Sequence, residues 1–79
     1  MKSETSAKKW LVKYVSDLVR IQPTEVDTSA TFDEYGLDSG ISMGLLAEFE
    51  RWLGSELPLS ILEHSPSIDE LAACATRSR

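Results

Sequence analysis

The chain has 79 residues, 42% of them hydrophobic, which is enough for one small domain that buries a single core. Its formal net charge is −5, with the bases concentrated in residues 1–20 and the acids in residues 21–76. This acidic middle argues against a nucleic-acid-binding protein, which would carry a basic stripe, and indicates partners with basic surfaces. The lone Cys74 excludes an internal disulfide. The sequence shows neither a signal peptide nor the apolar run of ~18 residues that a membrane span needs, so we expect a cytoplasmic protein without membrane contact.

A first helix is predicted up to about Arg20, because Pro23 prevents it from continuing. Its apolar residues fall at intervals that a helix brings onto one face: Trp10, Leu11, Tyr14, Val15, Leu18 and Val19. The lysines of this segment fall outside that face. They form either a solvated surface or a contact with a partner or neighbouring chain, and the sequence does not decide between the two.

Residues 21–38 form a long connection that is rich in Thr, Ser, Asp and Glu. A loop of this length inside a compact domain is unusual unless it is pinned or functional. We expect its scattered apolar residues to pin it against the helices: Ile21, Val26, Phe32, Tyr35 and Leu37.

A second helix is predicted from about Ser39 to Leu53, with Asp38 as N-cap and Gly54 as the C-terminal stop. A helical wheel places one set of residues on a buried arc of about 140°: Ile41, Ser42, Leu45, Leu46, Phe49, Trp52 and Leu53. The opposite, exposed arc holds Gly40, Met43, Gly44, Ala47, Glu48, Glu50 and Arg51.

Two glycines and an alanine lie on that exposed arc, at positions 40, 44 and 47. A glycine in a helix interior costs roughly 1 kcal/mol relative to alanine, and Gly44 has no evident structural reason. Small residues beside Met43 make a low surface that another protein can approach closely. Simple tolerance of glycine at a solvent-facing position is the alternative.

The remaining sequence predicts a short third helix and a longer last one. Pro58 to Glu63 supplies one or two helical turns, and Ser67 with Glu70 forms a capping box before the last helix. No segment predicts a strand. The fold class is therefore all-α: a small four-helix bundle of three main helices plus a short third helix, with a long loop between the first and second helices.

Ser39 has three possible roles: a helix cap, a catalytic nucleophile or an attachment point. Catalysis needs a base, and the only histidine, His64, lies in the short third segment without the G-x-S-x-G spacing of hydrolases. Attachment suits the position, because the N-terminus of a helix presents N–H groups and partial positive charge to a phosphate ester. A cap alone leaves the glycine-bearing face and the acidic bias unexplained.

Gly36-Leu37-Asp38-Ser39, within "TFDEYGLDS", resembles the modification signature of acyl carrier proteins, and "LPLSILEHSPSIDELA" (57–72) is similar to the family's third and fourth helices. The likeness covers roughly residues 11–75 and is greatest to carrier domains of polyketide synthases. It implies a single carrier domain, 1–79 with a core of about 8–76. It also implies a non-catalytic protein that bears acyl intermediates as thioesters on a 4'-phosphopantetheine arm, in polyketide or related natural-product biosynthesis.

The resemblance also implies site residues and partners. Ser39 would carry the arm, which coenzyme A donates, and Asp38 would be a cap and a contact for the phosphopantetheinyl transferase. The other expected partners are an acyltransferase or acyl-ligase, a ketosynthase and further modifying or releasing enzymes, acting on a monomer without a metal site. Residues at or near the family's recognition positions are Gly40, Met43, Gly44, Ala47, Glu50 and Glu63.

The sequence departs from the family at Gly40, where relatives carry a larger hydrophobe, and at Gly44, where many carry an acid. We interpret these glycines as narrowing or redirecting the choice of partner. Two rival functions stay open: a peptidyl carrier domain of a nonribosomal peptide synthetase, and an unmodified helical interaction module in which Ser39 is only a cap.

Overall fold

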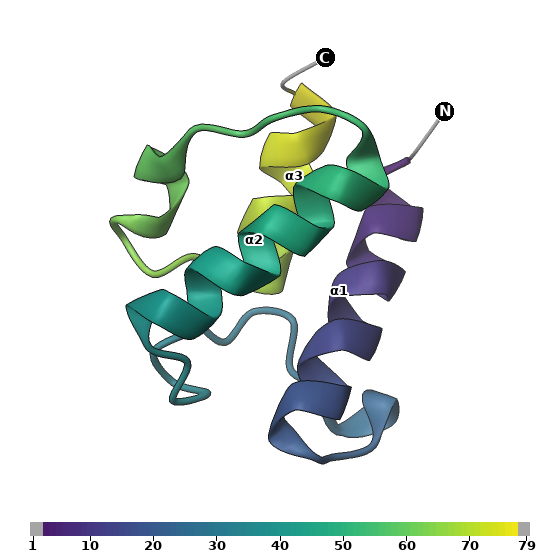
Figure 1. Ribbon diagram of the computed structural model, residues 1–79. Helices are drawn as coiled ribbons and strands as arrows, with labels where there is room; N and C mark the ends of the chain where they lie inside the picture. The colour runs from purple at the N-terminus through teal and green to yellow at the C-terminus, as the bar shows by residue number, and fades with distance from the viewer. Residues whose placement is uncertain (1–2, 78–79) are drawn as a thin grey trace.

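The computed structural model describes residues 3–77 and shows a small helical domain (Figure 1). Among these residues there is no strand, only an isolated bridge between Thr31 and Ser67. The predicted bundle of three main helices and a short third one is confirmed, and the short one is a 3₁₀-helix. The elements are α1 (Glu4–Val19), η1 (Pro23–Glu25), α2 (Ser39–Leu53), η2 (Leu59–Leu62) and α3 (Ile68–Arg77).

Helix α1 begins at Glu4, before the predicted core boundary of about residue 8. Ser3 is its N-cap: the Ser3 hydroxyl accepts from the Ser6 N–H at 3.1 Å, and the Ser6 hydroxyl accepts from the Ser3 N–H at 3.0 Å. This reciprocal pair satisfies two N–H groups that a helix start leaves without partners. The helix ends at Val19, and its C-cap Arg20 adopts a left-handed conformation with φ 61°.

The core forms where α1, α2 and α3 meet. Helix α1 contributes a buried stripe at four-residue spacing, Ala7, Leu11 and Val15, and it packs against α3. Trp10 joins α1 to α2, with its ring 5.4 Å from that of Phe49 and 5.8 Å from that of Trp52. Each fully buried Leu, Ile or Phe contributes about 1.5–3 kcal/mol. Other buried residues are Leu45, Leu46, Ile68, Leu71, Ala72 and Ala75.

Two residues that the helical patterns place on buried faces are exposed. Ile41 and Leu18 are each 40% exposed. Ile41 lies in the first turn of α2, at the end where α2 diverges from α1, and Leu18 lies in the last turn of α1 (Figure 1). A helical wheel assigns burial by angle alone, and end turns have fewer neighbours than the middle of a helix.

The long connection between α1 and α2, residues 20–38 (loop 1), is pinned as predicted. Phe32 and Leu37 are buried, and Val26 and Tyr35 pack at the edge of the core. Ile21 is only half-buried and does not join that cluster.

Backbone contacts also join loop 1 to the segment that leads into α3. The Phe32 N–H donates to the Pro66 carbonyl at 3.0 Å, and the Asp69 N–H donates to the Thr28 carbonyl at 3.0 Å. This loop therefore has a fixed conformation, and it delivers the chain to the start of α2.

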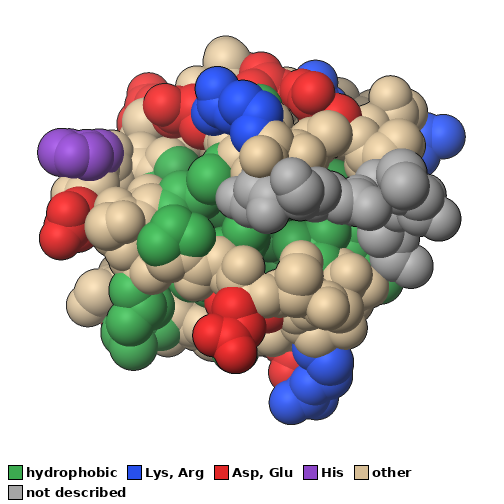
Figure 2. Space-filling model, turned by 90° about the horizontal axis from the view of Figure 1, so that it is seen from above, with side chains coloured by type: hydrophobic (Ala, Val, Ile, Leu, Met, Phe, Trp, Pro, Cys, Tyr) green, Lys and Arg blue, Asp and Glu red, His purple; other side chains and the backbone are tan. Residues whose placement is uncertain are grey.

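The surface carries charges of both signs. On the face shown in Figure 2, acidic and basic side chains are interspersed rather than gathered into a patch of one sign. Within residues 3–77 no helix has the length and apolar character that crossing a membrane requires.

Candidate functional site

Ser39 is the first residue of α2 and is exposed. Asp38 is the N-cap, as predicted: its backbone is extended, and its Oδ1 accepts from the Ile41 N–H at 2.8 Å. This bond ties the loop to the helix at the residue before the serine. The Ser39 hydroxyl is thus held at the positive end of the helix dipole, a position that favours an anionic ester.

The two residues before Asp38 turn the chain outward. Gly36 has φ +75°, a left-handed conformation that suits glycine, and Leu37 is buried. The Leu37 N–H donates to the Phe32 carbonyl at 3.0 Å, which fixes this turn. Because Leu37 is anchored in the core, Ser39, two residues later, is presented at the surface.

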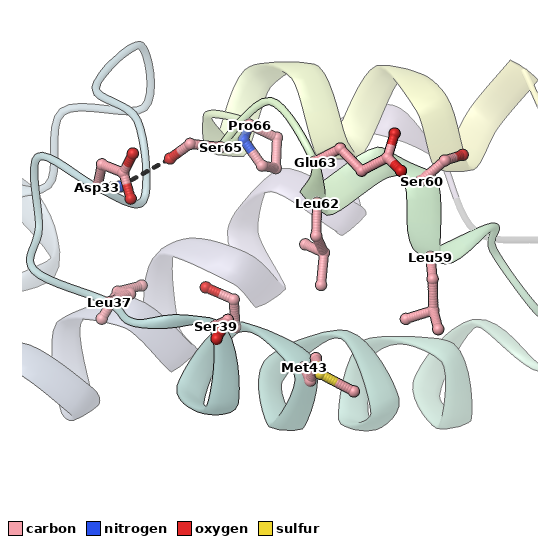
Figure 3. A pocket seen from close by; sticks show the side chains of 11 residues that line it. Asp33, Leu37, Ser39, Met43, Leu59, Ser60, Leu62, Glu63, Ser65 and Pro66 are labelled. Atoms are coloured by element: carbon pink, nitrogen blue, oxygen red, sulfur yellow. Dashed lines mark hydrogen bonds between the residues drawn. The ribbon is translucent and has the colours of Figure 1, made fainter.

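Ser39 lines a cavity of about 370 Å³ between α2 and η2 (Figure 3). Ser39 and Met43 lie on consecutive turns of α2, and Leu59 and Leu62 point toward them from η2. Met43 is 50% exposed and Leu59 is 61% exposed, so these two side chains form an apolar mouth. The other lining residues are Asp33, Leu37, Ser42, Ser60, Glu63, Ser65 and Pro66.

The lining supplies no base of the kind that activates a catalytic serine. None of the lining residues is His, Lys or Arg, and the exposed His64 is not among them. A Ser–His pair is therefore not formed. What the site offers is an accessible hydroxyl beside a groove that is lined by both apolar and polar side chains.

The predicted recognition residues have different surroundings. Gly40, Met43, Gly44 and Ala47 are exposed along α2, and the exposed Glu63 follows η2. Their contacts with partners stay a prediction.

Glu50 differs from the sequence-based expectation, because its side chain is half-buried rather than on the exposed arc. Its carboxylate accepts from the Leu57 N–H at 2.6 Å, and Leu57 is only 6% exposed. Glu50 thus pins the chain that runs from α2 toward η2. The wheel did not reveal this, because the segment after Gly54 folds back over that side of α2.

Asp33 and Ser65 were not identified from the sequence, although both line the cavity. The Asp33 N–H donates to Ser65 Oγ at 2.9 Å, and Ser65 has a left-handed backbone with φ 48° (Figure 3). This contact joins loop 1 to the turn before α3. Nothing in the local spacing of either residue indicates the pairing.

Residues 3–77 hold no group of three or more His, Cys, Asp and Glu side chains arranged to bind a metal ion. Cys74 is half-buried in α3 and engaged in a contact.

The sequence matches the family described as "Phosphopantetheine attachment site" over residues 9–75. It is 30% identical over 63 residues to the acyl carrier protein TtuC of Teredinibacter turnerae, covering 80% of this chain and 72% of that protein. It is 35% identical over 63 residues to the polyketide synthase PksL of Bacillus subtilis, covering 80% of this chain and 1% of that protein. The chain thus corresponds to most of the first relative and to a very small part of the second.

Two solved structures of carrier proteins are also similar to this chain. An acyl carrier protein of Anabaena, described as having a variant phosphopantetheinylation-site sequence, has a TM-score of 0.88 and 29% identity, covering 96% of this chain and 86% of that one. A free-standing peptidyl carrier protein of Acinetobacter baumannii has a TM-score of 0.76 and 26% identity, covering 91% of this chain and 90% of that one.

Proposed function

The chain belongs to the phosphopantetheine attachment-site family, whose members are non-catalytic carriers of a covalent 4'-phosphopantetheine, and on that premise we propose that Ser39 bears the arm. One observation carries the proposal: the exposed Ser39 hydroxyl stands at a helix N-terminus and at the edge of the cavity between α2 and η2. Ser39 is not needed as a helix cap, because Asp38 already caps α2.

The residues around Ser39 fit the group in size and polarity. The cavity of about 370 Å³ is lined by the apolar side chains of Leu37, Met43 and Leu62 and by the hydroxyls of Ser42, Ser60 and Ser65. Pantetheine itself alternates amides with methylene groups, so it can use both kinds of contact. The α2 N-terminus supports the phosphate electrostatically.

Loading requires Ser39 Oγ to act as the nucleophile toward the pyrophosphate of coenzyme A. The O–P bond to Ser39 forms, the pyrophosphate bond breaks with release of adenosine 3',5'-bisphosphate, and the hydroxyl proton passes to a base of the transferase. Once attached, the arm supplies a thiol that holds acyl groups as thioesters. The domain's own contribution is to present that thiol to successive partners at high local concentration.

The family and the relatives support a carrier of acyl groups that serves polyketide or related natural-product biosynthesis. We propose residues 1–79 as one carrier domain, monomeric and cytoplasmic, whose core begins at Ala7, slightly before the expected boundary of about residue 8. Its partners are a phosphopantetheinyl transferase, an acyltransferase or acyl-ligase, a ketosynthase and other modifying or releasing enzymes. The exposed residues Gly40, Met43, Gly44, Ala47 and Glu63 are the proposed contact surface.

The test is intact mass spectrometry after incubation with a promiscuous phosphopantetheinyl transferase and coenzyme A. We expect the mass to rise by one phosphopantetheine, and Ser39→Ala to abolish the gain. Ser42→Ala is the matched control, because Ser42 also lines the cavity but is buried and should leave modification intact. A chain that stays unmodified, or one whose Ser39→Ala variant is still modified, contradicts the proposal.

The peptidyl carrier alternative shares the fold and the attachment, so cargo separates the two. Loading of the modified protein by acyltransferases rather than by adenylation domains is the expected result. Replacement of Gly40 and Gly44 by the commoner family residues should also change transfer rates across a panel of partners. Unchanged rates would contradict the interpretation that these glycines direct partner choice.

A further inference from the structure

A second groove lies along α1, on the lysine-bearing surface whose role the sequence alone did not decide. This α1 groove has a volume of about 400 Å³. None of its lining residues lines the Ser39 cavity, and α1 and η2 lie on opposite sides of α2 in Figure 1, so the groove is a separate site. The lining residues come from α1 and from the start of η1: Thr5, Lys8, Lys9, Val12, Lys13 and Pro23.

The surface that lines the α1 groove is mostly apolar, although three of its residues are lysines. Val12 is half-buried and packs at the edge of the core, and Pro23 is exposed beside it. Lysine side chains cover a surface with their methylene stems and extend their ammonium groups into water. An occupant of the groove therefore meets hydrocarbon where it is seated and positive charge beside it.

These lysines contrast with the acidic character of the rest of the chain. Three of the eight Lys and Arg side chains in the sequence line the α1 groove. Residues 21–76, in comparison, carry eleven acids and a single base, Arg51. An acidic partner is thus attracted to α1 and repelled by most of the remaining surface, which determines where it binds.

The three ammonium groups are accessible to such a partner. That of Lys9 has no ion pair or hydrogen bond with any other residue of the described segment, 3–77. Lys8 lies 3.0 Å from Asp69 and Lys13 lies 2.8 Å from Asp17, with the lysine side chains 40% and 69% exposed. Exposed ion pairs contribute little because water screens them, so a partner's carboxylate can join or replace them.

We propose that the α1 groove docks an acidic amphipathic segment of a partner protein, whose apolar side chains cover Val12 and Pro23 and whose carboxylates pair with the three lysines. The groove follows α1 from Thr5 to Lys13, about 12 Å, which matches two turns of an amphipathic helix laid along it. The docked segment leaves the Ser39 cavity uncovered, so it tethers the carrier while other proteins reach the attachment site. This inference goes beyond the proposed function, and the binding itself does not depend on Ser39.

Two other occupants fit the α1 groove less well. An anionic membrane is flat, whereas the groove is concave, and the domain's net charge of −5 opposes its approach to such a surface. A second copy of the chain has the exposed apolar side chains of Met43 and Leu59 to offer, and these lie at the Ser39 cavity. Docking through them would cover the attachment site of that copy.

The experiment titrates the isotopically labelled protein with an acidic peptide, a helix of about 15 residues in which glutamates border a leucine stripe. Binding is followed by NMR chemical shifts and by fluorescence anisotropy, and a control peptide carries lysine in place of each glutamate. The protein variants are Lys9→Glu, Lys13→Glu and the double variant. Lys8 is left unchanged, because its ion pair with Asp69 ties α1 to α3. Arg51→Glu is the matched control, because Arg51 is an exposed base outside the groove.

We expect the acidic peptide to shift the amide signals of residues 5–13 and to leave those around Ser39 unchanged. The double variant should weaken binding about tenfold at low salt and reduce its dependence on ionic strength, and each single variant should weaken it about threefold. Arg51→Glu should change the affinity by less than about twofold. Saturating peptide should not slow transfer of phosphopantetheine to the wild-type protein, because the two sites share no residue.

Several results would overturn this inference: no binding of the acidic peptide, equal binding of the lysine peptide, unchanged affinity of the double variant, or shifts confined to the Ser39 cavity. Groove signals that shift with protein concentration alone would assign the groove to a second copy of the chain. Binding to phosphatidylglycerol vesicles without binding to the peptide would assign it to a membrane, and either result rejects the proposed occupant. A chain that binds the peptide but is not modified at Ser39 contradicts the proposed function alone.

Discussion

Replacement of Gly44 by alanine should stabilise the domain. Gly44 lies in the middle of α2 with ordinary helical backbone angles, and a Cβ placed there meets no atom within 4 Å. Neither conformation nor space therefore requires glycine. The full difference in helix propensity should appear, about 0.5–1 kcal/mol in the free energy of unfolding. For a domain of this size that corresponds to a rise in Tm of roughly 2–8 °C.

Thermal and urea unfolding followed by circular dichroism measures this change, with two other glycines as controls. Gly40→Ala should gain less, because Gly40 lies in the first turn of α2, where helix propensity contributes less than in the interior. Gly54→Ala should destabilise by about 1–2 kcal/mol, because Gly54 has φ +77°. An unchanged or lower Tm for Gly44→Ala would refute the reasoning and mean that glycine has a structural role at this position.

Three further predictions concern the elements around the site. Asp38→Ala should cost about 1 kcal/mol by removing the N-cap bond to the Ile41 N–H, and Asp38→Asn should restore most of it in urea unfolding. Phe32→Ala should cost about 3–5 kcal/mol and increase hydrogen exchange throughout loop 1, because Phe32 is 1% exposed. Hydrogen bonds from the hydroxyl and N–H of Ser29 hold the pKa of Asp27 below its ordinary value of 3.8. This carboxylate therefore stabilises the fold above that pH and loses its contribution as the pH falls through the lowered pKa. The unfolding midpoint of Asp27→Asn should accordingly depend less on pH below about 4 than that of the wild type.

The features that could be predicted from the sequence are those that depend on neighbouring residues. The bounds of α2, its Asp38 cap and its Gly54 stop all agree with the structure. The capping box of Ser67 and Glu70 is also present, with bonds of 2.9 and 3.1 Å. Each of these involves contacts within one helical turn, so residue type and spacing are sufficient.

The features that could not be predicted depend on how the chain folds back. The Glu50 bond to Leu57 requires the turn after α2, and the Asp33 bond to Ser65 joins residues 32 positions apart. The start of α1 could not be predicted for another reason: in its capping box, Ser6 takes the position that is usually Glu or Gln. The sequence therefore predicts that Ser39 begins α2, but not the contacts between loop 1 and the turn before α3 that surround it.

The joint between residues 28–33 and 65–69 has a consequence for biogenesis. It joins segments more than 30 residues apart, so it cannot form until the segment before α3 has been synthesised. During synthesis on the ribosome, loop 1 and α2 emerge well before the segment that anchors them. We therefore expect a nascent chain to become a good substrate for pantetheinylation only after its last helix has left the exit tunnel, so that immature carriers escape premature loading.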